Sequence, residues 1–167
     1  MGDNTDKNAG IRISNLGGKY LTFVLNREEY GLGILRIKEI IGMMDITAVP
    51  RTPDFVKGVI NLRGKVIPVL DLRTRFSISE QAYTDKTCII VVELDRDNTV
   101  VQLGMVVDSV SEVLTIPDKA IEAPPAFGTS VNTDCILGMA KMDTGVKILL
   151  DIDKVVGEYD LNQVPAG

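Results

Sequence analysis

The sequence contains no histidine, and this absence excludes most familiar kinds of active site. Histidine is the commonest general base and metal ligand, so Ser-His and Cys-His catalytic pairs are excluded. The two cysteines, Cys88 and Cys135, lack the spacing of zinc ligands, and no glycine-rich phosphate-binding loop is present. The carboxylates Asp151, Asp153 and Asp71 fit helix starts and turns better than acid–base catalysis. The sequence therefore predicts a non-catalytic protein with no cofactor and no metal site.

Tryptophan is also absent, and acidic residues outnumber basic ones by 23 to 18, which gives a net charge of -5. Nucleic-acid-binding proteins normally carry a basic patch, and anionic membrane surfaces attract basic segments. No apolar run approaches the ~20 residues of a membrane-spanning helix, and the polar N-terminus does not resemble a signal peptide. We therefore expect a cytoplasmic protein with two free, core-type cysteines, no nucleic-acid partner and no direct insertion into a membrane.

Short apolar segments separated by polar or glycine-containing turns occupy most of the chain, and they predict an all-β fold. Valine and isoleucine are each more frequent than leucine, and β-branched side chains favour strands because they pack well on a pleated surface. A short helical turn is expected near 53–57, where proline precedes and glycine follows, and a short C-terminal helix is expected after the last strand.

The two halves of the chain resemble each other, which indicates an internal duplication. Gly31-Leu32-Gly33-Ile34 matches Gly104-Met105-Val106-Val107, and Leu70-Asp71-Leu72 matches Leu150-Asp151-Ile152. Each copy holds about five short strands, and such units usually close into barrels because closure removes exposed strand edges.

The duplication predicts two β-barrel subdomains packed together, flanked by two short segments. The expected boundaries are a flexible N-terminal segment at 1–17, in which 11–13 is a candidate to pair with the second barrel, a first barrel at 18–82, a second at 83–157, and a C-terminal tail at 158–167. The alternative function for such a fold is a small barrel that binds oligosaccharides or nucleic acids, but this use needs aromatic platforms and a basic groove.

The segment FVKGVINLRGKVIPVLDL carries the clearest functional signal, because it places the cation of Arg63 at the tip of a tight turn between two apolar strands. Strand alternation predicts that Ile37 and Glu39, in the preceding strand, point to one face, and that Lys38 and Ile40 point to the other. A Glu39–Arg63 ion pair beside Ile37 is therefore a candidate partner-binding patch. Its counterpart in the second half, CILGMAKMDTGVKILLDI, lacks this tip and is expected to have a longer turn.

These motifs resemble those of the chemotaxis coupling proteins of the CheW-like domain family. The resemblance rests on FVKGVINLRGKVIPVLDLR, YGLGILRIKEIIG, GMVVDSVSEVL and ILLDIDKVV, which together cover residues from about Tyr20 to Val156. It implies two five-stranded barrels of SH3-like type and a scaffold that acts through protein surfaces alone. The implied partners are the regulatory domain of the histidine kinase CheA and the cytoplasmic tips of methyl-accepting chemoreceptors, to whose membrane arrays the chain would be recruited through these partners.

The resemblance also implies roles for individual residues. The receptor-binding residues that it implies are Ile37, Glu39, Arg63, Val107 and Val110. The kinase-binding residues that it implies are Leu21, Ile34 and Ile37, of which Ile37 serves either side.

Overall fold

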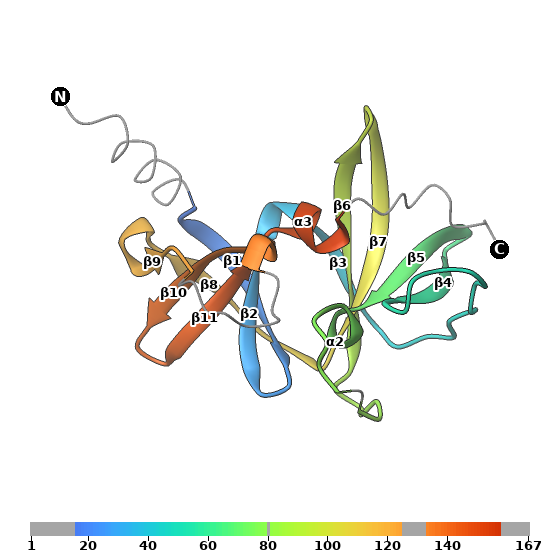
Figure 1. Ribbon diagram of the computed structural model, residues 1–167, viewed down its shortest axis with the longest axis horizontal. Helices are drawn as coiled ribbons and strands as arrows, with labels where there is room; N and C mark the ends of the chain where they lie inside the picture. Colours follow the sequence, from blue (N-terminus) through green and yellow to red (C-terminus); the bar gives the residue numbers. More distant parts are fainter. Residues whose placement is uncertain (1–15, 80, 125–132, 158–167) are drawn as a thin grey trace.

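The computed structural model describes residues 16–79, 81–124 and 133–157, and within them the chain forms two β-sheets (Figure 1). Sheet A contains β1 (Gly18–Leu25), β2 (Glu28–Gly33), β8 (Ser109–Ile116), β9 (Ile121–Glu122), β10 (Ile136–Met142) and β11 (Gly145–Leu150). Sheet B contains β3 (Ile37–Gly42), β4 (Val56–Leu62), β5 (Lys65–Asp71), β6 (Cys88–Arg96) and β7 (Thr99–Val107). The predicted all-β class with two strand units is confirmed.

Both sheets share one topology, which reflects the internal duplication. The order is β8-β1-β2-β11-β10-β9 in sheet A and β3-β6-β7-β5-β4 in sheet B, so β8 corresponds to β3 and the central pairs correspond likewise. The described ladders stay open instead of closing into complete barrels. The segment that follows β3 makes only a short contact with β4, the Thr47–Val59 bridge. The segment that follows β8 likewise makes only a short contact with β10, through the two-residue strand β9.

Sheet membership departs from the predicted boundaries 18–82 and 83–157. Sheet B is continuous in sequence, from β3 to β7, whereas sheet A combines β1 and β2 with the strands from β8 onward. The cause is the length of the two crossovers, which are the helical turn η1 (Ile34–Arg36) between β2 and β3 and the single residue Asp108 between β7 and β8. One extended residue spans only ~3.5 Å. This length is too short for the chain to turn back at the end of β7 and place β8 on the far side of β6 in the same sheet. The strand therefore runs on into the other sheet.

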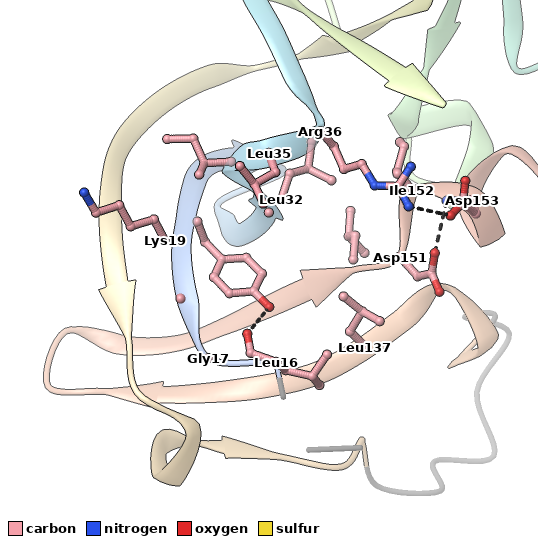
Figure 2. A pocket seen from close by; sticks show the side chains of 15 residues that line it. Leu16, Gly17, Lys19, Leu32, Leu35, Arg36, Leu137, Asp151, Ile152 and Asp153 are labelled. Carbon is pink, nitrogen blue, oxygen red and sulfur yellow. Dashed lines mark hydrogen bonds and ion pairs between the residues drawn. The ribbon is translucent and has the colours of Figure 1, made fainter. Parts of the chain in front are cut away.

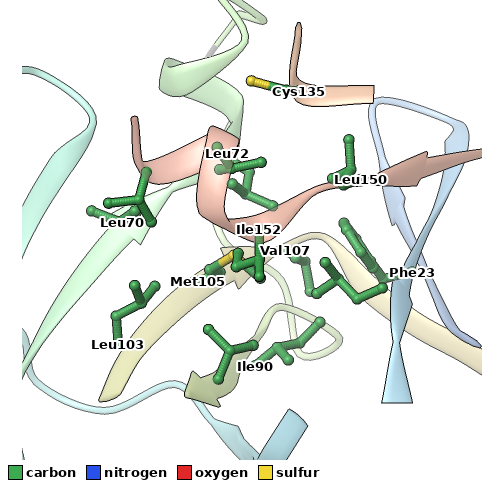
Figure 3. Packing of buried hydrophobic residues seen from close by; sticks show 14 of the residues in the cluster. Phe23, Leu70, Leu72, Ile90, Leu103, Met105, Val107, Cys135, Leu150 and Ile152 are labelled. Carbon is green, nitrogen blue, oxygen red and sulfur yellow. The ribbon is translucent and has the colours of Figure 1, made fainter. Parts of the chain in front are cut away.

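The largest hydrophobic cluster lies between the two sheets and draws residues from both of them. Figure 3 shows Phe23 and Leu150 of sheet A facing Ile90, Met105 and other residues of sheet B. Two smaller clusters belong to single sheets, one around Val69 and Val91 in sheet B and one around Tyr20 and Leu149 in sheet A. Because the shared cluster is the largest, each sheet depends on the other for much of its burial.

Two short helices follow equivalent strands, α2 (Leu72–Arg75) after β5 and α3 (Ile152–Val156) after β11. The carboxylate of Asp71 accepts from the backbone N–H of Arg73 at 2.9 Å, and that of Asp151 accepts from the N–H of Asp153 at 3.1 Å. These bonds cap the first turns, as short polar side chains do at helix starts. The predicted C-terminal helix and the capping role of Asp71 are therefore confirmed.

The helical turn expected near 53–57 is present only as a single turn that ends at Val56. The N–H of Val56 donates to the carbonyl of Pro53 at 2.9 Å, which closes a single turn, and β4 begins at Val56 itself. The strand takes precedence because the side chain of Val56 is buried in the cluster between the sheets. The predictions for 1–15, including the pairing of 11–13, and for the tail at 158–167 lie outside the described residues. Within the described ranges, the chain forms no helix long and apolar enough to span a membrane.

Candidate partner-binding surfaces

The internal duplication provides a reference for finding functional residues, because equivalent positions have equivalent surroundings. A Cβ atom added at Gly31 would lie 2.9 Å from Cδ2 of Leu149, and one added at Gly104 would lie 3.5 Å from Cγ2 of Val69 and 2.7 Å from Cγ2 of Ile89. Gly31 and Gly104 thus occupy equivalent positions, and at each a Cβ atom would meet a neighbouring side chain, from the parallel strand β11 in sheet A and from the antiparallel strand β6 in sheet B. Positions at which the copies differ in exposure or charge are therefore the candidates for a role beyond folding.

The first difference is the hairpin tip at Arg63. Arg63 and Gly64 form a two-residue turn with φ values of 52° and 86°, typical of a type I′ turn, and Asn61 Oδ1 accepts from the N–H of Gly64 at 2.8 Å. The exposed guanidinium donates to the carboxylate of Glu39, so the predicted ion pair is present. The pair connects β3 to the turn between β4 and β5. Because β3 and β4 are the two edge strands of the sheet B ladder, the pair links opposite edges of that sheet.

The equivalent site in sheet A has no such pair. Asp143 occupies the position of Arg63 and Glu112 that of Glu39, so two acids stand where sheet B has opposite charges. Met142 pairs with Gly145 across this turn just as Leu62 pairs with Lys65, so the expected longer turn is wrong and the two turns have equal length. The difference between the hairpins is therefore one of charge and not of backbone length.

Ile37 and Glu39 lie on opposite faces of β3, which corrects the prediction from strand alternation. Ile37 pairs with Val92 and Glu39 with Val91, which leaves Lys38 as an extra residue at a bulge. Paired residues share a face, and consecutive residues of β6 alternate, so the bulge reverses the expected relation. Ile37 accordingly packs against the cluster between the sheets, away from the Glu39–Arg63 pair.

Two of the predicted site residues are inside the protein. Val107 is fully buried in the cluster between the sheets, and Leu21 is buried in the same cluster, so neither exposes a side chain for direct contact. Both lie on strands that have neighbours on both sides, β7 and β1, and whose inward faces the other sheet covers. Val110, on the edge strand β8, is half-buried and packs against this cluster.

The second difference is the turn η1, which carries exposed apolar side chains. Leu35 is 96% exposed, and its counterpart in the other crossover is the acidic Asp108. Ile34 is 36% exposed, and its counterpart is the buried Val107. The sequence predicted Ile34 as a contact but missed Leu35. The signal that identifies Leu35 is an apolar residue whose partner in the duplication is charged.

A groove of about 410 Å³ lies beside this turn (Figure 2). Its lining includes the apolar side chains of Leu16, Tyr20, Leu32, Leu137, Leu150 and Ile152. Figure 2 shows Lys19 and the Arg36–Asp153 ion pair around the groove, close to Leu35. An apolar groove next to an exposed apolar turn is typical of a protein-interaction surface. Among the described residues, no group of acidic or cysteine side chains has an arrangement that could hold a metal ion.

The crossover between β7 and β8 is held by an ion pair between the buried Arg73 and the partly buried Asp108. Arg73 of α2 donates from Nε to Asp108 Oδ1 at 2.8 Å and from Nη2 to Oδ2, and Asp108 Oδ2 also accepts from the N–H of Asn26 at 2.8 Å. Partial burial raises the pKa of Asp108, but the bonds from Arg73 and Asn26 and the charge of Arg73 lower it further, so the net pKa is below the usual value for aspartate. Through Asp108, these bonds connect α2, which follows β5 of sheet B, to Asn26 in the turn between β1 and β2 of sheet A.

This pKa shift predicts a loss of stability in acid. A carboxyl group with a lowered pKa in the folded state stabilises the fold fully above its unfolded pKa of about 4, and this stabilisation disappears as the pH falls through the folded pKa. We expect wild type to exceed Asp108→Asn in urea midpoint at pH 6, and the difference to shrink steadily below about pH 4. Midpoints measured from pH 6 to 2.5 test this, and a difference independent of pH would contradict the assignment.

Comparisons with known proteins identify the family of the chain. The family model described as CheW-like domain matches residues 19–159. The chain is 36% identical over 146 residues to "Chemotaxis protein CheW" of Klebsiella aerogenes, covering 87% of this chain and 86% of the relative. It is 34% identical over 141 residues to "Chemotaxis protein CheW" of Bacillus subtilis, covering 84% of this chain and 87% of that one.

A solved structure has the same fold. The crystal structure of the scaffolding protein TtCheW from Thermoanaerobacter tengcongensis matches with a TM-score of 0.75 and 37% identity, covering 85% of this chain and 94% of that one. The match extends over both sheets of the chain and not over one copy of the duplication alone. The chain therefore belongs to the CheW-like domain family and is a non-catalytic scaffold protein of chemotaxis.

Proposed function

We propose that this chain couples a histidine kinase of the CheA type, through the kinase's regulatory domain, to the cytoplasmic tips of chemoreceptors. The observation that carries the proposal is the pair of departures from the internal duplication. One is the exposed apolar turn at Ile34 and Leu35, and the other is the charged Glu39–Arg63 tip. An adaptor needs two separate contact surfaces, and these two features centre on different elements, the first on η1 and the second on the β4–β5 hairpin with Glu39 of β3.

The apolar turn is the better candidate for the kinase. A stable contact between folded domains needs apolar side chains at its centre, and Leu35 offers nearly its whole side chain beside an apolar groove. Ile34 extends this surface, whereas Ile37 and the buried Leu21 pack in the cluster between the sheets. The proposed kinase contact thus keeps Ile34 from the sequence prediction and adds Leu35.

The charged tip is the better candidate for the receptor. Arg63 and Glu39 form an exposed pair that contributes only ~0–1 kcal/mol to stability, so stability alone gives little reason for it. Val110 lies on the edge strand of the other sheet and is half-buried. We propose that Arg63 and Glu39 contact the receptor directly, that Val110 contributes at the edge of this contact, and that Ile37 and Val107 act only through the backbone that they support. Recruitment to receptor arrays at the membrane follows from these partner contacts.

A binding titration with the regulatory domain of a chemotaxis kinase tests the proposal. We expect wild type to bind with a dissociation constant of tens of micromolar or tighter, and Leu35→Asp to weaken binding by on the order of tenfold or more, as loss of a central apolar contact does. Val100→Asp is the control, because Val100 is an apolar side chain that is 60% exposed on β7 and does not line the groove. No binding by wild type at tens of micromolar, or equal losses for both variants, would contradict the proposal.

The alternative of an oligosaccharide- or nucleic-acid-binding module is not favoured. Family membership points to a protein scaffold, and the net charge of -5 opposes binding to polyanions.

A further inference from the structure

We propose that the ion pair between Arg36 and Asp153 positions the Ile34–Leu35 turn and thereby sets the affinity of the chain for its kinase partner. The inference rests on the proposed function, because it concerns the surface assigned there to the kinase. It assigns a positioning role to two residues that need not touch the partner at all.

The turn η1 has little internal structure to hold it. None of its three residues is buried, and no side chain caps its first turn. Its closing contact is the N–H of Ile37, which donates to the carbonyl of Ile34. Leu35 is almost fully exposed and adds almost no packing, so among the apolar side chains of the turn only Ile34, which is 36% exposed, packs against the rest of the fold. An exposed turn of this kind needs a contact from elsewhere in the fold to present one conformation to a partner.

Asp153 supplies such a contact from a rigid helix. Arg36 Nη2 lies 3.0 Å from Asp153 Oδ2, across 117 positions of sequence. The helix α3 that carries Asp153 is anchored by its other side chains, because Ile152, Val155 and Val156 are buried between the sheets. Arg75 Nε further donates to the carbonyl of Val155 at 2.6 Å. The ion pair therefore connects a weakly held turn to a firmly held helix.

The other crossover uses the same arrangement with the charges reversed. There the crossover carries the acid, Asp108, and the second residue after the capping aspartate of the helix is the base, Arg73. That pair is the more buried of the two, with the side chains of Arg73 and Asp108 7% and 30% exposed, whereas those of Arg36 and Asp153 are 42% and 44% exposed. An exposed pair adds little to overall stability, so its main physical consequence is the local position of the turn.

Charge reversal in the full-length protein tests the proposal. The single variants Arg36→Asp and Asp153→Arg each replace the attraction by repulsion, whereas the double variant restores an ion pair of opposite sense and leaves the net charge unchanged. We expect each single variant to bind the kinase regulatory domain roughly tenfold more weakly, and the double variant to return to within about threefold of wild type. Thermal midpoints should stay close to wild type throughout, because the pair is exposed.

Amide hydrogen exchange at Ile37, measured without any partner, reports the turn itself. Exchange at this N–H should be faster in both single variants and return toward the wild-type rate in the double variant. If the double variant binds as weakly as the singles, Arg36 or Asp153 contacts the kinase directly and the positioning role is wrong. If the single variants bind like wild type while Leu35→Asp does not bind, the positioning role is wrong and the proposed kinase surface stands. If Leu35→Asp binds like wild type, the proposed kinase surface is wrong, and the exchange rates alone then decide the positioning role.

Discussion

Replacing Glu29 by glutamine is expected to lower the free energy of unfolding by about 1.5–3 kcal/mol. Lys147 lies on β11 with a side chain only 3% exposed, and its ammonium donates to the carboxylate of Glu29 on the parallel neighbour β2. The substitution leaves a buried positive charge with no opposite charge, which is among the most destabilising changes a core can undergo. Urea denaturation of both proteins at pH 7 measures the difference.

The internal duplication supplies the control for this variant. The counterparts of Glu29 and Lys147 in the other copy are Gln102 and the buried Ile67, so the fold already accepts an amide and an aliphatic side chain at these two positions. We expect the double variant Glu29→Gln/Lys147→Ile to lie within about 1 kcal/mol of wild type or above it, because removing both charges removes the need for pairing. A single variant that loses less than about 1 kcal/mol would contradict the burial of this pair.

Replacing Arg63 by alanine is expected to leave the fold intact and to abolish most receptor-dependent activation of the kinase. The pair with Glu39 is exposed, so the free energy of unfolding should change by no more than about 1 kcal/mol. If Arg63 contacts the receptor, its loss should lower kinase activation in reconstituted receptor–kinase–scaffold assemblies on the order of tenfold. Phosphorylation of the kinase, measured with and without receptor, gives this factor.

Asp143→Ala is the matched control for Arg63→Ala, since Asp143 occupies the equivalent position of the equivalent hairpin and is likewise exposed. It should activate the kinase as wild type does. Glu39→Ala should resemble Arg63→Ala, because it removes the other half of the pair. Activation at the wild-type level by both Arg63→Ala and Glu39→Ala would show that the charged tip is not the receptor contact.

Local features of this fold were predictable from the sequence because short-range chemistry determines them. The Arg63-Gly64 turn follows from a glycine that accepts positive φ between two apolar strands. The capping roles of Asp71 and Asp151 follow from carboxylates placed directly before short helices. The Glu39–Arg63 pair was also predicted, although by an argument from alternation that the bulge at Lys38 makes wrong for Ile37.

Features that depend on pairing between distant strands were not predictable in this way. A bulge adds one residue without any clear sign in the sequence, and it reverses the face of every residue before it. The burial of Val107 and Leu21 depends on the other sheet, which packs over their strands. The interleaving of the two copies depends on a crossover of one residue, Asp108, whose shortness is visible only once the ends of β7 and β8 are known.

A ternary binding measurement tests the central claim, that one chain carries two separate partner surfaces. The kinase regulatory domain and a receptor cytoplasmic fragment are added in turn to the immobilised full-length chain. Wild type should bind both at once, Leu35→Asp should retain only the receptor fragment, and Arg63→Ala should retain only the kinase domain. Competition between the two partners for wild type, or loss of both partners in either variant, would contradict an adaptor with separate surfaces.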